Sequence, residues 1–203
     1  LKVQNDGNAA LDFLVNGTAG GSGWTVKYFD ATSGGTDITT AVTTNAWWTP
    51  SLAAGAAKEF RVEVTPGSTV AGGSVKDVLV TAMARGDSSK KDAVKATTTV
   101  TTRRQPDALI RNSAEATYLG DNVYNADGTA QTKAQSVLSG IKATYMLKVQ
   151  NDGNALDSVK VTGTAGTSGW TVRYFDATSA GTDVTASVTG TGWTVLSMAV
   201  GAV

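Results

Sequence analysis

Short stretches in which apolar and polar residues alternate recur along the chain. In residues 60–64 the apolar side chains of Phe60, Val62 and Val64 alternate with the charged side chains of Arg61 and Glu63. A period of two places all apolar side chains on one face of a β-strand. The same pattern predicts further strands at residues 25–29, 75–85, 93–102, 108–111, 143–150, 158–162, 171–175 and 184–188.

The sequence repeats itself over a long distance. The first eight residues, LKVQNDGN, return letter for letter as residues 147–154, and GWTV at 23–26 returns at 169–172. Both matches have an offset of 146 positions (147 − 1 = 146) and need no gap. Solenoid repeats are about 20 to 50 residues long, whereas a small domain has about 100 to 150. The repeat therefore indicates a tandem array of domains.

The period does not divide the chain evenly, because 203 residues hold one period and 57 more (203 − 146 = 57). We expect residues 1–102 to form a domain that lacks its first strand or strands, residues 103–106 to form a short stiff linker, and residues 107–203 to form a second copy that lacks its last strands. Either the sequence is an excerpt of a longer polypeptide, or neighbouring chains complete each other by strand exchange. Exchange of residues 58–102 would leave residues 1–57 of the donor as a surplus copy, which favours an excerpt.

Turn signals separate the predicted strands. Asn5, Asp6, Gly7 and Asn8 form one cluster of turn-forming residues, which we interpret as a hairpin turn. The 23 Gly residues and the abundance of Thr and Val also favour strands and turns over helices. About seven short strands per repeat at this spacing indicate an all-β fold of antiparallel two-sheet sandwiches.

Composition narrows the possible functions. The 17 basic and 17 acidic residues balance, and no basic stripe points to a nucleic-acid partner. Without Cys, the chain has neither a disulfide framework nor a thiolate metal site. No apolar run reaches the roughly 18 residues that a membrane span requires.

The sequence also contains few side chains of the kinds that usually act in catalysis. The chain contains no His for acid–base chemistry, no Cys nucleophile and no Gly-x-Ser-x-Gly elbow. Glu59 and Glu63 form a carboxylate pair at a spacing of four, but an alternating strand would place them on a solvated face. We therefore expect no enzymatic activity in this chain.

The order of the motifs carries a family resemblance. The NDGN turn is followed by GWTV, by a Trp ahead of residues 52–56, and by the segments 58–66 and 75–84. This order is similar to the Ig-like, fibronectin III-like modules of bacterial and archaeal extracellular proteins, including the type associated with α-galactosidases. The resemblance implies a β-sandwich that spaces, links or presents other domains. Residues 118–138 depart from the short connection usual in such modules.

Large aromatic rings between two sheets can anchor a sandwich that has no disulfides. Trp48 is adjacent to Trp47, so it should point to the opposite face, and its counterpart in the second copy is Thr194. Trp48 is therefore the candidate for a ligand or interface contact. A rival interpretation makes the other tryptophans a platform that stacks on sugar rings. The residues that we expect in the core are Trp24, Tyr28, Trp47, Phe60, Trp170, Tyr174 and Trp193.

Residues 121–128 match a calcium-binding loop only in part. Asn125, Asp127 and Gly128 fit the pattern D-x-[DN]-x-[DN]-G, but the first ligand position falls on Val123 and the closing Glu is absent. Asp121, Asn125 and Asp127 are thus weak candidate metal ligands. We expect no cofactor, with calcium as the open alternative.

The junction at Arg103, Arg104 and Pro106 contains no Gly or Ser, which predicts a stiff connection. Together with the near-identical copies, it indicates a structural repeat of an extracellular filament, stalk or cell-surface array. Such a repeat would assemble end to end with copies of itself, without nucleic acid or a membrane span. The alternative is a carbohydrate-binding, adhesion or spacer module of a large secreted protein, with polysaccharide as its partner. Lys–Asn isopeptide bonds also remain open.

Overall fold

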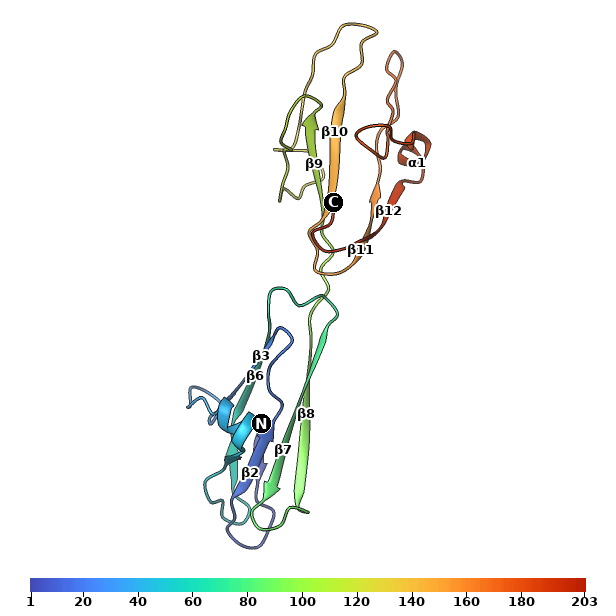
Figure 1. The fold of residues 1–203 in the computed structure, drawn as a ribbon. Coiled ribbons are helices and arrows are strands. Elements are labelled where there is room, and N and C mark those ends of the chain that lie inside the picture. Colours follow the sequence, from blue (N-terminus) through green and yellow to red (C-terminus); the bar gives the residue numbers. More distant parts are fainter. The chain divides into compact units, whose positions relative to one another are not determined.

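The computed structural model describes all 203 residues, which form a predominantly β protein (Figure 1). Its sheets are antiparallel, as the alternating pattern predicts. The strands are β1 (Lys2–Gln4), β2 (Phe13–Gly17), β3 (Trp24–Phe29), β4 (Trp47–Trp48), β5 (Ala57–Glu59), β6 (Arg61–Pro66), β7 (Val75–Ala84), β8 (Lys91–Thr99), β9 (Pro106–Asn112), β10 (Tyr145–Asn151), β11 (Asp157–Val161) and β12 (Trp193–Met198).

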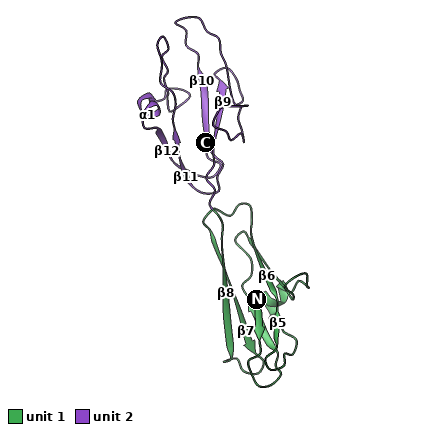
Figure 2. Cartoon of the chain, turned by 180° about the vertical axis from the view of Figure 1, so that it is seen from behind, with its two compact units in different colours: residues 1–101 green, residues 102–203 purple.

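The chain divides into two compact units (Figure 2). Unit 1, Leu1–Thr101, contains β1 to β8 and a short helical turn, η1 (Ala41–Asn45). Unit 2, Thr102–Val203, contains β9 to β12 and the short helix α1 (Thr185–Thr189).

Unit 1 contains a four-stranded sheet in the order β4-β2-β7-β8 and two strand pairs, β1-β5 and β3-β6. The longest ladder joins β7 to β8 and runs from Val75 opposite Thr99 to Met83 opposite Lys91. Both strands are rich in β-branched residues, whose restricted side chains favour extended backbone.

Strand β3 illustrates how alternation builds the core of unit 1. Trp24, Val26 and Tyr28 are buried, whereas Thr25 and Lys27 between them are exposed. Val26 and Tyr28 join inward-facing residues of the other sheets, so a single core holds all the sheets of unit 1 together. The buried cluster consists of Val3, Val15, Val26, Tyr28, Ile38, Val42, Phe60, Val78 and Val80.

Unit 2 consists of two antiparallel pairs, β9-β10 and β11-β12. Residues 113–144 form a long connection between β9 and β10. The buried apolar side chains of unit 2 include no aromatic ring, in contrast to unit 1. They are Leu109, Val159, Val188 and Met198.

The prediction of a strand at residues 184–188 is wrong, because this segment forms the start of α1. Val184 and Val188 are one helical turn apart, and the Val188 N–H donates to the Val184 carbonyl at 3.0 Å. The Asp183 carboxylate accepts the N–H of Thr185 at 2.9 Å, which satisfies a donor that the start of a helix leaves open. Val188 is buried. Apolar residues four positions apart lie on the same face of a helix, and in this segment the chain forms a helical turn instead of a strand.

The strand predicted at residues 171–175 is also not part of a sheet. Only Phe175 forms an isolated bridge, with Asp183. In unit 1 the matching strand β3 pairs along its whole length with β6, and unit 2 contains no strand equivalent to β6. Alternation therefore shows that a segment can form a strand, but a hydrogen-bonding partner decides whether it does.

The turn at residues 5–8 does not close a hairpin. Strand β1 pairs with β5, whereas β2 pairs with β4 and β7. The turn therefore carries the chain from one sheet to another.

Candidate binding surfaces

The loop that follows β1 is held by a buried asparagine. Asn5 is 1% exposed, and its side-chain amide donates to the carbonyls of Ala9 at 2.8 Å and Leu52 at 2.7 Å. Its side-chain carbonyl accepts the Gly7 N–H at 3.0 Å. Asn5 therefore binds three backbone groups that lie outside the named strands.

The second copy reproduces this network at the offset of 146. Asn151 is 1% exposed and donates to the carbonyls of Ala155 and Met198, each at 2.9 Å. It also accepts the Gly153 N–H at 3.0 Å. Sequence reasoning missed this role because a polar residue in a turn motif suggests an exposed side chain. The exact return of the motif was the signal that could have found it.

A tyrosine forms a second shared network. The Tyr28 hydroxyl donates to the Thr18 carbonyl at 2.9 Å, and the Tyr174 hydroxyl donates to the Thr164 carbonyl at 3.0 Å. Burial raises the pKa of Tyr28 to about 12. Both tyrosines thus act as structural donors that tie an earlier loop to the segment in which they lie.

The residues that were expected in the core are more buried in unit 1 than in unit 2. In unit 1, Trp24, Tyr28 and Phe60 are buried. Trp47 is half-buried, with its ring centroid 6.2 Å from that of Phe60. These aromatic rings supply the largest side chains of the core of unit 1.

In unit 2, Tyr174 and Trp193 are only half-buried, and the placement of Trp170 in the core is wrong. Trp170 is 71% exposed, whereas its counterpart Trp24 is 8% exposed. The cause is the missing partner strand, because Trp24 lies opposite Pro66 of β6.

Trp48, the candidate for a ligand contact, is 39% exposed on β4. The Arg85 guanidinium lies 4.4 Å from the centroid of its ring, a cation–π distance. Arg85 also approaches Asp12 at 3.5 Å. One face of the exposed ring is thus covered by this arginine, which is distant in sequence and which no local pattern predicts.

The oxygens of the candidate calcium loop are used within the loop. Asn125 accepts the Gly128 N–H at 2.9 Å, and Asp121 accepts from the Asn122 amide at 3.1 Å. Asp127 accepts the Thr129 N–H at 2.9 Å, and this hydrogen bond lowers the pKa of the Asp127 carboxyl. No group of three or more His, Cys, Asp or Glu residues with metal-binding geometry is present. These side chains therefore act as hydrogen-bond acceptors that stabilise the turns of the loop.

The junction residues are held by unit 2. The Arg103 N–H donates to the Asn154 side chain at 2.7 Å, and its guanidinium donates to the Asp152 carbonyl at 2.8 Å. The Asp152 N–H in turn donates to the Gln105 carbonyl at 2.7 Å. Pro106 is the first residue of β9. The segment predicted as a linker thus packs against the NDGN turn of the second copy.

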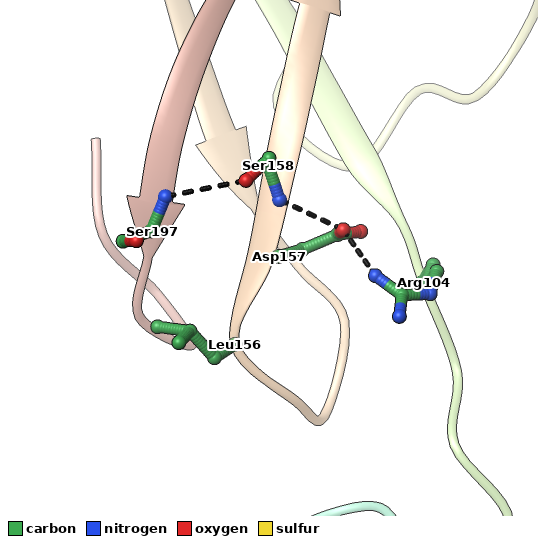
Figure 3. Close-up of a pocket in the computed structure, with 5 residues that line it drawn as sticks. All are labelled: Arg104, Leu156, Asp157, Ser158 and Ser197. Carbon is green, nitrogen blue, oxygen red and sulfur yellow. Dashed lines mark hydrogen bonds and ion pairs between the residues drawn. The ribbon is translucent and has the colours of Figure 1, made fainter.

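A small pocket of about 190 Å³ lies beside this segment (Figure 3). Arg104 forms an ion pair with Asp157, which also accepts the Ser158 N–H at 2.8 Å. The Ser158 hydroxyl accepts the N–H of Ser197 at 3.3 Å, and no basic side chain contacts it. Leu156 completes the lining. The polar groups of this pocket therefore pair with one another and do not form a nucleophile with its base.

Comparisons of the chain with protein-family models, with characterised proteins and with solved structures found no match. No helix of the protein is long and apolar enough to cross a membrane.

Proposed function

We propose that the chain is a non-catalytic structural repeat of an extracellular filament, stalk or cell-surface array. In this proposal its units are tandem Ig-like, fibronectin III-like β-sandwiches, and its main partner is a further copy of itself. The single observation that carries the proposal is the repetition of side-chain hydrogen-bond networks at a fixed offset.

The repetition extends beyond sequence to side-chain contacts. Asn5 and Asn151 make the same three hydrogen bonds, and Tyr28 and Tyr174 bind equivalent carbonyls. Repeated units present the same surface at each step, so one favourable contact between units can recur along an array. Catalysis requires no such repetition.

The non-catalytic part of the proposal is supported by the side chains themselves. The Ser158 hydroxyl lacks a base, and Asp157 beside it is neutralised by Arg104. The pocket that they line is small and open.

A binding module is the second candidate, and the exposed Trp48 is the observation that favours it. A sugar-binding platform needs a free aromatic face, but Arg85 lies over this ring. The second copy has Thr194 at the same position. A carbohydrate site that depended on Trp48 would therefore not recur along an array.

Electron microscopy of the purified full chain and of native material tests the proposal. Regular filaments, or arrays with a constant axial repeat, are the expected result. Dispersed single particles at all concentrations would contradict self-assembly and would favour a spacer or binding module. Binding of polysaccharides that is lost in Trp48→Ala would favour the binding module specifically.

A further inference from the structure

Strand β9 carries a buried carboxylate that has no ionic partner. Asp107 is 1% exposed, and its Oδ2 accepts the Asn122 N–H at 2.9 Å. Its Oδ1 is buried and accepts no hydrogen bond, and Asp107 takes part in none of the ion pairs of the protein. Burial of an ionised carboxylate is costly unless a cation or a hydrogen-bond donor faces it. The Oδ1 atom of Asp107 therefore needs a partner.

A second buried oxygen without a donor belongs to the Gln131 side chain. The Gln131 Nε2 donates to the Asn125 Oδ1 at 3.1 Å, whereas the Gln131 Oε1 accepts no hydrogen bond. The Asn125 Oδ1 also accepts the Gly128 N–H at 2.9 Å. Turning the Gln131 amide round would place two carbonyl oxygens against each other. The Gln131 Oε1 therefore stays on the side away from Asn125, as a buried acceptor without a donor.

The Gln131 Oε1 shares a small space with a backbone carbonyl of β9. A Cβ atom on Gly120 would lie 2.8 Å from the Gln131 Oε1 and 3.0 Å from the Ala108 carbonyl oxygen. The two oxygens thus flank one point, which a glycine keeps free of side-chain atoms. Ala108 follows Asp107 on β9, and the Asn122 N–H that binds Asp107 lies two residues after Gly120. Three oxygen ligands therefore surround the turn at residues 120–122.

The side chains near this turn supply negative charge. The Tyr124 hydroxyl donates to the Asp152 Oδ2 at 2.9 Å. This hydrogen bond, followed by desolvation and the charges of Asp152 and Asp107, raises the pKa of Tyr124. The Arg103 guanidinium opposes the effect, but it binds the Asp152 backbone carbonyl at 2.8 Å. Two carboxylates close to one hydroxyl favour a divalent cation over a monovalent one.

The oxygens around the turn are of the kinds that calcium prefers. Ca²⁺ binds carboxylate, amide and backbone carbonyl oxygens in flexible geometry and completes its shell with water. Mg²⁺ requires a near-octahedral set of ligands and gives up its waters reluctantly. The chain has no His or Cys, the side chains that zinc and copper prefer.

We propose that the turn at residues 120–122 of unit 2 binds a calcium ion. Its protein ligands are the Asp107 Oδ1, the Gln131 Oε1 and the Ala108 carbonyl oxygen, and water completes the shell. The ion ties β9 to the connection at residues 113–144, so bound calcium should stabilise unit 2. The inference goes beyond the proposed function and is independent of self-assembly, so calcium binding and filament formation can fail separately.

Calcium titration of the full chain tests the site. After removal of bound metal with EDTA, calorimetry with CaCl₂ should give one site per chain. MgCl₂ should bind about tenfold or more weakly, because of its stricter geometry. Terbium bound at the site should emit on excitation of the nearby Tyr124, and calcium should abolish this emission by displacement. NaCl at the same ionic strength is the control for screening.

Three variants locate the ion. Asp107→Asn keeps the shape of the side chain and removes its charge, so calcium affinity should fall about tenfold or more. Gly120→Ala should have a similar effect, because its methyl group would lie against the Gln131 Oε1 and the Ala108 carbonyl oxygen. Asp127→Asn is the matched control, since the Asp127 carboxylate binds a backbone N–H of its own loop. It should bind calcium as the parent chain does.

Melting temperatures separate loss of binding from failure to fold. Calcium should raise the melting temperature of the parent and of Asp127→Asn, but not that of Asp107→Asn. Circular dichroism of Asp107→Asn without calcium should match that of the parent. Absence of calcium binding by the parent would overturn the inference and leave water as the partner of both oxygens. Equal loss of binding in Asp127→Asn would place the ion in the loop and would also overturn it.

Discussion

Asn5 shows how much of this fold depends on one polar side chain. Asn5→Ala removes the side-chain partner of the Ala9 carbonyl and the Gly7 N–H, and one of the two donors to the Leu52 carbonyl. A buried polar group without a hydrogen bond costs about 1–3 kcal/mol. We therefore expect the free energy of unfolding of unit 1 to fall by at least that amount, measured by urea denaturation.

The neighbouring Asn8 provides the control, because its side chain is exposed. Asn8→Ala should change stability by less than about 0.5 kcal/mol. Asn5→Asp tests the mechanism, since it keeps the acceptor for Gly7 but loses both donors. Equal stability of the Asn5 and Asn8 variants would show that the buried network does not stabilise the loop.

Gly17 lies directly against the Tyr28 ring. A Cβ atom at Gly17 would meet the Tyr28 hydroxyl and lie 2.9 Å from Cε1 of the ring. Gly17→Ala should therefore destabilise unit 1 by about 1–3 kcal/mol, as overpacking does. In the double variant with Tyr28→Phe the loss should be less than the sum of the two single losses, because the hydroxyl is the nearest clashing atom. Strict additivity in thermal denaturation would contradict this contact.

Residues 25–29 and 171–175 differ only by Lys27 and Arg173, yet only the first segment is a strand. We expect that a copy of residues 58–101 added after Val203 would supply the missing partner and convert residues 171–175 into a strand. Hydrogen–deuterium exchange should then slow at the amides of residues 171–175. Quenching of Trp170 fluorescence by acrylamide should fall at the same time.

An added copy that carries the equivalent of Val62→Asp and Val64→Asp is the control for this extension. Its length is the same, but its apolar face cannot enter the core. The amides of residues 171–175 should then exchange as fast as in the original chain. Equal protection with both added copies would mean that the extension acts without forming the strand pair.

The alternation of apolar and polar residues therefore predicts which segments can form strands better than it predicts which strands pair. Alternation located β3, β6, β7, β8, β9, β10 and β11, because each has a partner within its own unit. It failed at residues 171–175, with which no strand of unit 2 pairs. It also failed at residues 184–188, where apolar residues four positions apart fit a helical turn as well.

The charges of the whole molecule balance, with 17 basic and 17 acidic residues, and several carboxylates are held by local donors. The Thr97 hydroxyl at 2.6 Å and the Lys95 ammonium at 3.0 Å lower the pKa of Asp77. Hydrogen bonds from Thr39 lower the pKa of Asp37. Donors in the folded state therefore favour the ionised form of these groups.

The direction of these shifts sets the dependence of stability on pH. A carboxyl whose pKa is lower in the folded state stabilises the protein above its unfolded pKa of 3.8, and this contribution is lost as the pH falls through the folded pKa. We expect the urea midpoint to be lower at about pH 3 than at pH 7. The Asp77→Asn and Thr97→Val variants should be less stable than the parent at pH 7 and approach it in acid. A parent midpoint that rises on acidification, or a gap that persists at low pH, would show that these carboxylates do not stabilise the fold by this route.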